Sequence, residues 1–400
     1  MFTRVYQIYK DSFSGLSGSV WLLSLIMFIN RAGAMVLTFM PLYLTQDLLF
    51  TKTEAGWVMG AYGAGSILGA YIGGQLTDRY GYYYIQLYSL IISSLLLVSL
   101  IFLEGFYPII FNIFLFATIS DTVRPANSVA IETFSEPENR LRSFSLMRFA
   151  INLGFSIGPA VGGIVAQWIG FKWVFLIDAF TCMSAAALLY AYLPNKKPMH
   201  KNVSNEATTS NASAYKDREY LIFIILVALW ATAFFQIFAS APLFWQSEWH
   251  FSESTIGMLL ALNGLLIVIM EMPFIKTMEH ITRNMKMIGL GSVMLAISFL
   301  CFLLGWVHII PAILFIIFMS FAEMFAMPFM TNYAVAKAPD SKRGQYMALY
   351  AMAYGVAHIV APLGSMTLAD TFGFETTYII LLILSSILVV SFFTFNKKIV

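Results

Sequence analysis

The two halves of this chain of 400 residues carry matching motifs in the same order. Arg124-Pro125-Ala126 and Gly158-Pro159 in the first half correspond to Met327-Pro328-Phe329 and Ala361-Pro362, about 200 residues later. A parallel repeat of apolar segments constrains the chain to fold as two similar bundles. In membranes, this arrangement is typical of proteins whose two rigid halves rock about a central site.

The composition indicates that lipid is the solvent for most of this surface. Apolar residues make up 59% of the chain and charged residues only 11%, against about 25% charged in soluble domains. The net charge of +2 does not indicate a nucleic-acid partner. Cys182 and Cys301 lie inside apolar runs, one in each half, and are interpreted as small core residues rather than as a disulfide. Residues 1–17 lack a cleavage pattern, so we expect the first apolar segment to be retained.

Apolar segments of membrane-spanning length recur along the chain. A transmembrane helix needs about 20 predominantly apolar residues, and on that basis the sequence predicts an all-α membrane protein with twelve transmembrane helices in two six-helix pseudo-repeats. The predicted domains are an N-terminal bundle (1–193), a polar cytosolic linker (194–218) and a C-terminal bundle (219–400). The predicted spans are 18–44, 55–77, 83–104, 107–131, 143–168, 171–193, 219–247, 254–277, 285–306, 309–335, 344–367 and 374–396.

Positive charges are unevenly divided between the two sides of the predicted membrane. Lys52 and Lys172 fall in loops on one side, whereas 18 of the 23 lysines and arginines fall on the other. Because cytosolic loops carry the excess of Lys and Arg, we expect both termini and the linker in the cytosol of a bacterial cell. The eighteen are Arg4, Lys10, Arg79, Arg140, Arg142, Lys196, Lys197, Lys201, Lys216, Arg218, Lys276, Arg283, Lys286, Lys337, Lys342, Arg343, Lys397 and Lys398.

The loop between the second and third spans carries a distinctive pattern. Gly74-Gln75-Leu76-Thr77-Asp78-Arg79-Tyr80-Gly81 resembles the G-x-L-x-D-R-x-G signature of the major facilitator superfamily. The plan of six plus six spans is similar to that family along the whole chain. The resemblance implies that Asp78 and Arg79, flanked by Gly74 and Gly81, form a conformational gate that latches neighbouring helices on the cytosolic side. The alternative interpretation is a helix-capping Asp in a tight turn.

The fifth predicted span contains closely spaced small residues. Gly154, Gly158, Gly162 and Gly163 would let neighbouring helices approach closely, and Pro159 would kink the span. The run resembles the G-P-x-x-G-G pattern of drug:proton antiporters of the superfamily, which implies export. Ordinary helix packing explains the same residues, so both interpretations stay open.

Ionisable residues inside the apolar spans are the sharpest functional clue. Each costs about 2.5–3.5 kcal/mol at mid-helix and therefore needs a partner or an aqueous cavity. Asp121 and Arg124 are i and i+3 neighbours on one helix face. Glu323 has no basic residue within one turn of its own helix, which makes it a candidate to load and release a proton. The full set is Arg31, Asp121, Arg124, Arg148, Asp178, Glu271, Glu323 and His358.

The family resemblance implies where these residues meet, because spans one, four, seven and ten line the central cavity in the superfamily. We predict Glu323 and Asp121 as the proton-coupling residues. The alternative is that Asp121–Arg124 and Arg31–Glu323 are static ion pairs that hold the bundle together, and Asp178 is interpreted as structural. The predicted substrate-cavity residues are Arg31, Asn30, Arg124, Gln236, Asn263 and His358.

Other functional classes lack support in the sequence. The chain has no Gly-Lys dipeptide, which excludes a P-loop and direct ATP drive. Its 5 histidines do not have zinc-ligand spacing. We therefore predict neither an enzyme, nor a catalytic residue, nor a metal site, nor a cofactor. A receptor or scaffold that transports nothing would share the fold and remains an alternative.

The sequence thus predicts a monomeric secondary transporter that exports small amphipathic or cationic molecules, coupled to protons, by alternating access. Its expected partners are the substrate, protons and membrane lipid. The rival is proton-coupled uptake of peptides, sugars or organic anions. Pro41-Leu42-Tyr43-Leu44-Thr45, after Arg31 and Gly33, is similar to the first span of proton-coupled oligopeptide transporters. That family has glutamates before its Arg, where this chain has Met27 and Asn30.

Overall fold

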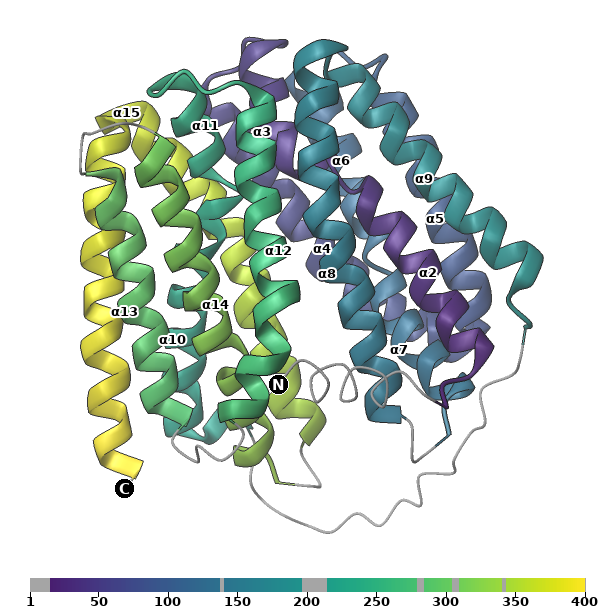
Figure 1. The fold of residues 1–400 in the computed structure, drawn as a ribbon. Helices are drawn as coiled ribbons and strands as arrows, with labels where there is room; N and C mark the ends of the chain where they lie inside the picture. Colours follow the sequence, from purple (N-terminus) through teal and green to yellow (C-terminus); the bar gives the residue numbers. More distant parts are fainter. Residues whose placement is uncertain are drawn as a thin grey trace, which may run out of the picture.

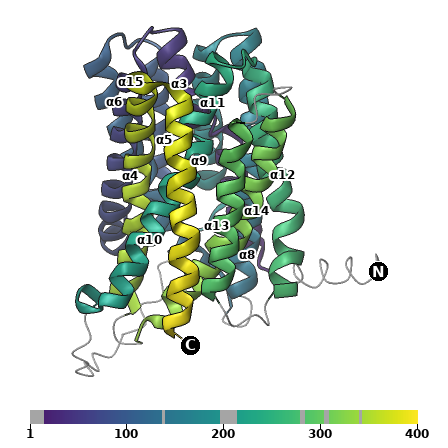
Figure 2. The same ribbon diagram turned by 90° about the vertical axis from the view of Figure 1, so that its left-hand side faces the viewer.

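The computed structural model describes residues 15–136, 140–195, 214–278, 284–303, 309–339 and 343–399. This part of the chain is built from helices and contains no strand. Helices of the first half gather on one side in Figure 1 and helices of the second half on the other, so that the second half faces the viewer in Figure 2. Residues 196–213, most of the predicted linker, lie outside the described residues.

The helices follow one another with short connections. The first half contains α2 (Gly18–Gly33), α3 (Val36–Gln46), α4 (Lys52–Tyr80), α5 (Tyr82–Leu100), α6 (Phe106–Ser120), α7 (Val123–Phe134), α8 (Arg140–Trp168) and α9 (Phe171–Tyr192). The second contains η2 (Ala214–Lys216), α10 (Arg218–Phe234), η3 (Phe235–Ile237), α11 (Ser240–Ser247), α12 (Glu253–Met278), α13 (Asn284–Phe302), α14 (Ile309–Lys337) and α15 (Arg343–Ile399). We call the end where α4 finishes and α10 begins the linker end, and the opposite end the far end.

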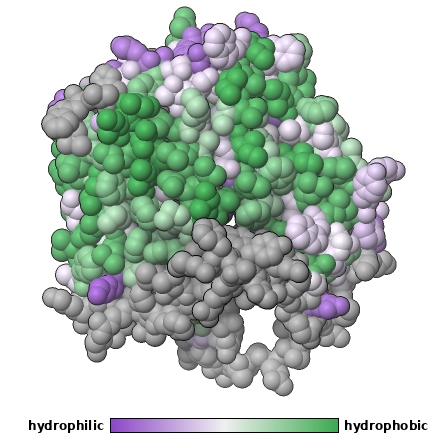
Figure 3. Space-filling view, in the orientation of Figure 1, coloured by the Kyte–Doolittle hydropathy of each residue, from purple (hydrophilic) through white to green (hydrophobic). Residues whose placement is uncertain are grey.

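The helices are long and apolar enough to cross a membrane. Ten stretches of the described residues meet this criterion, and the last of them runs through Gly373, where a φ of 84° divides α15 into two helices. With α4, of 29 residues, they account for the twelve predicted spans and confirm the predicted all-α membrane fold. Apolar residues cover the middle of the face in Figure 3, and hydrophilic ones gather toward its upper edge, the far end.

The backbone repeats itself between the halves. Leu49 and His250 are the two non-glycine residues of the described chain with positive φ, at 54° and 53°. They occupy matching loops, after α3 and after α11. Gly170 and Gly373, with φ of 109° and 84°, likewise begin the sixth helix of each half. These positive-φ conformations recur at matching positions because the two bundles share one architecture.

Three predicted spans are interrupted near their middles, which the sequence analysis did not foresee. The first divides into α2 and α3, the fourth into α6 and α7, and the seventh into α10, η3 and α11. Pro125 and Pro242 fall in the first turn of α7 and of α11, where the missing N–H of proline is tolerated. Apolar periodicity continues across each break, so hydropathy alone does not reveal it.

The predicted gate loop is shorter than expected. We expected residues 78–82 to form it, but α4 continues to Tyr80 and α5 begins at Tyr82. Gly81 makes the turn alone, with a φ of 82° and its N–H donated to the Thr77 carbonyl at 2.9 Å. Glycine adopts this conformation without steric cost, so no longer loop is needed.

The gate residues themselves are only partly described. The Arg79 guanidinium lies 5.2 Å from the ring centroid of Tyr80 and is exposed. Gly74 has open space where a side chain would start. The side chain of Asp78 lies outside the described residues, so the predicted latch between Asp78 and its neighbours stays a prediction.

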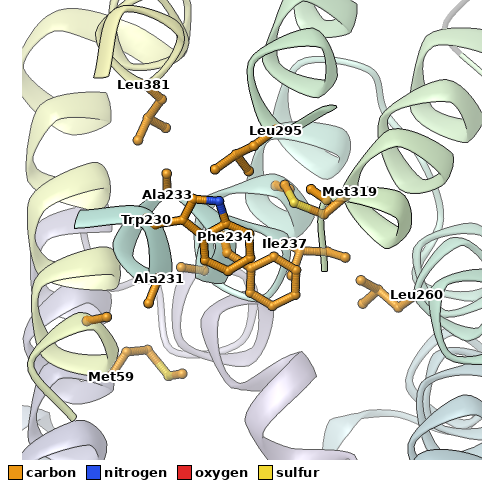
Figure 4. Close-up of a cluster of buried hydrophobic side chains, with 14 of the residues drawn as sticks. Met59, Trp230, Ala231, Ala233, Phe234, Ile237, Leu260, Leu295, Met319 and Leu381 are labelled. Carbon is orange, nitrogen blue, oxygen red and sulfur yellow. The ribbon is translucent and has the colours of Figure 1, made fainter. Parts of the chain in front are cut away.

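Large aromatic residues hold the second bundle together. Trp230 and Phe234 of α10 stack with ring centroids 5.3 Å apart. Leu295 of α13, Met319 of α14 and Leu381 of α15 surround them (Figure 4). Because these residues come from most helices of the half, the bundle can move as one body.

The two halves meet through glycines in the half of the bundle nearer the far end. A Cβ atom at Gly257 of α12 would lie 2.1 Å from the Pro159 carbonyl oxygen of α8, and one at Gly163 would lie 2.3 Å from the Glu253 oxygen. On the opposite seam, a Cβ at Gly63 of α4 would lie 2.8 Å from the His358 backbone of α15. These contacts close the far end, and α8 and α12 separate toward the linker end in Figure 1.

We predict that Gly257→Ala opens the far end. The added methyl overlaps the Pro159 carbonyl, and overpacking of this kind costs about 1–3 kcal/mol, or roughly a tenfold loss of the closed population. Spin labels at Asp47 and Glu248, exposed at the far end in opposite halves, should show a new population with a longer distance. Gly364→Ala is the matched control, since nothing lies within 4 Å of a Cβ there. An unchanged distance distribution in Gly257→Ala would contradict the proposed seam.

Candidate functional site

A cavity of about 370 Å³ lies between the two halves. This volume is within the range of small-molecule sites, roughly 300–1,000 Å³. Its walls come from both bundles, including α2, α4, α7, α8 and α9 of the first and α10, α12, α14 and α15 of the second. Six predicted site residues line it: Asn30, Arg31, Arg124, Asn263, Glu323 and His358.

The break in the first span is stabilised by Asp178. Its Oδ2 accepts a hydrogen bond from the Val36 N–H at the start of α3, 3.4 Å away. Its Oδ1 accepts from the Cys182 Sγ at 3.7 Å, and Asn30 Nδ2 donates to the same sulfur at 3.3 Å. A helix that begins inside the membrane leaves N–H groups without partners, and a carboxylate at that end satisfies them. These contacts support the structural interpretation of Asp178.

The glycines of α8 bring its backbone against Arg31. A Cβ at Gly154 would lie 2.7 Å from the Arg31 Cβ, and one at Gly158 would lie 3.2 Å from the Ala32 oxygen. The Arg31 guanidinium lies 5.5 Å from the ring centroid of Phe155. Its Nε is buried without a hydrogen-bond partner, and it forms no ion pair with any described residue. The static pair between Arg31 and Glu323, which was the alternative interpretation of these residues, is therefore not formed.

The remaining residues of the glycine motif have other contacts. Gly162 lies under Phe39 of α3, where a Cβ would be 2.8 Å from the ring. Gly163 and Pro159 contact α12 of the other half. One motif thus serves two purposes, since part of it packs the first bundle around Arg31 and part of it closes the far end.

Asp121 and Arg124 form the ion pair expected from their spacing. Arg124 Nε lies 2.8 Å from Asp121 Oδ1, and Ser66 of α4 donates a hydrogen bond to the other carboxylate oxygen. The Arg124 side chain is 52% exposed and that of Asp121 only 2%. Arg124 therefore faces the cavity, and Asp121 lies behind it and fixes its position.

Glu323 lies where two cavities join. A second cavity of about 300 Å³ shares Glu323, Ile267, Met327 and Tyr354 with the first. It continues past Arg148 and Thr331, toward the linker end. Glu323 is thus placed on the route between the central cavity and that end of the molecule.

The other predicted residues differ in their surroundings. Gln236 is buried and does not line the cavity, because its Nε2 donates to the Thr232 and Ala361 carbonyls and its Oε1 accepts from Ser240. Asn263 donates to Ser320 Oγ at 2.9 Å. His358 stacks on Phe235, with ring centroids 3.9 Å apart. The side chain of Glu271 lies outside the described residues.

Several aromatic residues of the cavity were not predicted. Tyr62, Phe155, Phe235 and Tyr354 line it together with Phe116. Aromatic residues make up 16% of the chain, so their identity alone does not mark them. For Phe155 a usable signal was its position directly after Gly154 of the glycine motif.

Comparison with known proteins gives a consistent result. A family model described as Major Facilitator Superfamily matches residues 20–362 and 223–398. The Na(+), Li(+), K(+)/H(+) antiporter of Planococcus maritimus is 22% identical over 88% of this chain and 90% of its own. The class H tetracycline resistance protein of Pasteurella multocida is 22% identical over 78% of each chain. A POT family transporter solved in complex with 5-aminolevulinic acid superposes with a TM-score of 0.81 and 16% identity, over 97% of this chain and 98% of the other.

We predict that Asp121→Asn destabilises the protein and that adding Arg124→Gln restores much of the loss. The single change leaves the Arg124 cation without its carboxylate. Removing one member of a buried pair costs about 3–5 kcal/mol, and the half-exposed Arg124 reduces this to about 1–3 kcal/mol. Thermal unfolding in detergent of the wild type, the two single variants and the double variant measures the coupling. A double variant no more stable than Asp121→Asn would show that the pair is not coupled.

Proposed function

The chain belongs to the Major Facilitator Superfamily, and we propose that it is a proton-coupled secondary transporter that exports small amphipathic molecules by alternating access. It is a multi-pass membrane transporter, and its family comprises transporters rather than enzymes. The observation that carries the proposal is the cavity of about 370 Å³ between the halves, with ionisable residues from both on its walls.

The two ends of the molecule support the alternating-access part of the proposal. The far end is closed by backbone contacts at Gly163, Gly257 and Gly63, whereas the cavity continues past Glu323 toward the linker end. If the rigid halves rock about the central cavity, the far end would open while the linker end closes. Positive-inside logic from the sequence assigns the linker end to the cytosol.

We assign the coupled proton to Glu323 first and to Asp121 second. Glu323 borders both cavities, so water and protons can reach it from the linker end and from the centre. Asp121 is 1% exposed, lies outside the lining and is engaged by Arg124 and Ser66. A proton-coupling residue needs a carboxylate that protons and water can reach, and Glu323 meets both requirements.

The names of the relatives support export. One is an antiporter that exchanges monovalent cations for protons, and another is a tetracycline resistance protein. A membrane potential of about 100 mV supplies roughly 2.3 kcal/mol per charge, enough for more than a tenfold gradient. The alternative is proton-coupled uptake of peptides, sugars or organic anions, which the similarity of the Pro41-Leu42-Tyr43-Leu44-Thr45 segment to oligopeptide transporters favours.

We predict that Glu323→Gln abolishes proton-coupled flux but retains substrate binding, because the amide keeps the shape of the carboxylate and cannot release a proton. The measurement uses purified protein in vesicles that enclose a pH-sensitive dye, with an imposed pH gradient and a substrate found by binding screens. We expect a loss of at least about a hundredfold in coupled flux, the lower end of the range for a removed proton-transfer group. Glu248→Gln, an exposed glutamate at the far end, is the control and should transport normally. Coupled flux at the wild-type rate in Glu323→Gln would remove this residue from the mechanism.

A further inference from the structure

One face of α14 and one face of α15 carry polar side chains at helical spacing. Glu323, Met327 and Thr331 follow one another at intervals of four on α14, and Tyr350 and Tyr354 do so on α15. Residues at this spacing lie above one another on a single helix face. From Glu323 to Thr331 the helix rises about 12 Å, and this rise points toward the linker end, where α14 finishes beside the start of α10.

The hydroxyl groups on these two faces are joined by hydrogen bonds. The oxygens of Thr331 and Tyr350 lie 3.0 Å apart, and those of Tyr350 and Tyr354 lie 3.2 Å apart. We call these three residues the hydroxyl row. Thr331 donates to the Met327 carbonyl at 3.0 Å, so its oxygen accepts from Tyr350. Because a hydroxyl donates once, the Tyr350 oxygen then accepts from Tyr354.

This order of donors leaves the inner end of the hydroxyl row ready to accept a proton. The Tyr354 oxygen keeps a lone pair, since its own proton is given to Tyr350. Tyr354 lines both cavities together with Glu323, and the Glu323 charge acts electrostatically on the Tyr354 hydroxyl. At the outer end Thr331 is exposed. The row therefore leads from the carboxylate to the linker end.

The hydroxyl row is also a polar edge of the second cavity. Most of the remaining lining is apolar and includes Ile267, Met324 and Pro328. Among the described residues, Thr331 and Tyr350 line this cavity and not the central one. A substrate in the central cavity would therefore leave these two hydroxyls uncovered.

We propose that the hydroxyl row of Thr331, Tyr350 and Tyr354 carries the proton between Glu323 and the linker end, on a path separate from the substrate. The inference rests on the proposed function, because it takes Glu323 as the residue that loads and releases the proton. When substrate and proton compete for one carboxylate, the proton must leave as the substrate arrives. A path along the second cavity permits both movements at once.

The transfer is a shift of O–H bonds along the row. The carboxyl proton of Glu323 bonds to the Tyr354 oxygen while the Tyr354 proton passes to Tyr350. The Tyr350 proton passes to Thr331, which gives its own proton to water. Each hydroxyl forms one O–H bond and breaks one, so the row stays neutral, the carboxyl becomes a carboxylate and the water becomes hydronium. Rotation of the three hydroxyls then restores their order.

The second cavity is built so that rocking of the halves can close this path. Arg148 of α8, in the first half, lines it together with residues of the second half. The hydroxyl row belongs to α14 and α15 alone, so it moves as part of one bundle. Closure of the linker end would bring the first half toward the outer end of the row, which prevents a continuous proton leak across the membrane.

The test measures proton transfer to Glu323 directly. Purified full chain in detergent receives a light-triggered pH jump and is followed by time-resolved infrared spectroscopy. The carbonyl band of the protonated Glu323 carboxyl is identified by its absence in Glu323→Gln. Uptake retraces the path of release, so the rise of this band reports on the row. No transport step enters the measurement, so slow rocking of the halves does not hide the result.

Tyr354→Phe and Tyr350→Phe should each slow the rise of the Glu323 band by at least about tenfold, less than the loss of the carboxylate itself, because water in the cavity still offers a slower route. The double variant should be no slower than either single variant, since the two hydroxyls act in series. Tyr346→Phe is the matched control. It lies one turn earlier on α15 and loses a hydrogen bond to Asp217, so its stability falls while its band should rise at the wild-type rate.

A wild-type rate in both Tyr350→Phe and Tyr354→Phe would overturn the proposal, as would a difference spectrum in which Glu323 gives no band. If these tyrosine variants take up protons normally while Glu323→Gln loses coupled flux, the row is rejected and the proposed function stands. If they are slow while Glu323→Gln transports normally, the row conducts protons to Glu323 and the coupling role of that residue is rejected.

Discussion

Ionised side chains inside this bundle must be compensated within the protein, because the hydrocarbon around it offers no counter-charge. The organisation of the central cavity follows from that requirement. Asp121 is covered by Ser66 and by Arg124, so the arginine is held with its exposed face toward the cavity. Asp178 accepts a hydrogen bond from the Val36 N–H at the start of α3. Arg31 lines the same cavity as the carboxylates of Asp178 and Glu323, so positive and negative groups share its walls.

The helix breaks and the charges depend on one another. An interrupted span exposes backbone N–H and C=O groups in the membrane, and these need polar partners. Asp178 supplies one at the α2–α3 break, and Gln236 supplies another by donating to the Thr232 carbonyl of α10. The breaks in turn bring the chain ends of short helices, with Arg31 and Asp121 on them, to the level of the cavity. The helix breaks therefore position the polar side chains at the cavity and also require them as hydrogen-bond partners for the freed backbone groups.

How much the sequence could predict differs between these features. Span positions, the twofold repeat and the Asp121–Arg124 pair follow from hydropathy and helical spacing, which are local properties. The one-residue turn at Gly81 and the break near Ala34 depend on dihedral angles that spacing does not encode. We predicted Gln236 in the cavity because its span was expected to line the cavity. Its hydrogen bonds instead direct its side chain into the wall. The two separate roles of the α8 glycines became visible only when their neighbours on α2 and α12 were known.

The charge of the substrate also bears on the direction of transport. Export of a monoanion in exchange for one proton moves two positive charges inward, so a potential of about 100 mV contributes roughly 4.6 kcal/mol per cycle. Export of a monovalent cation for one proton, or uptake of a monoanion with one proton, moves no net charge and depends on concentration gradients alone. For a monoanionic substrate, antiport would thus be strongly driven by potential even without a pH difference, whereas symport would not. The substrate charge that the cavity selects therefore determines how strongly the membrane potential drives each of the two transport directions.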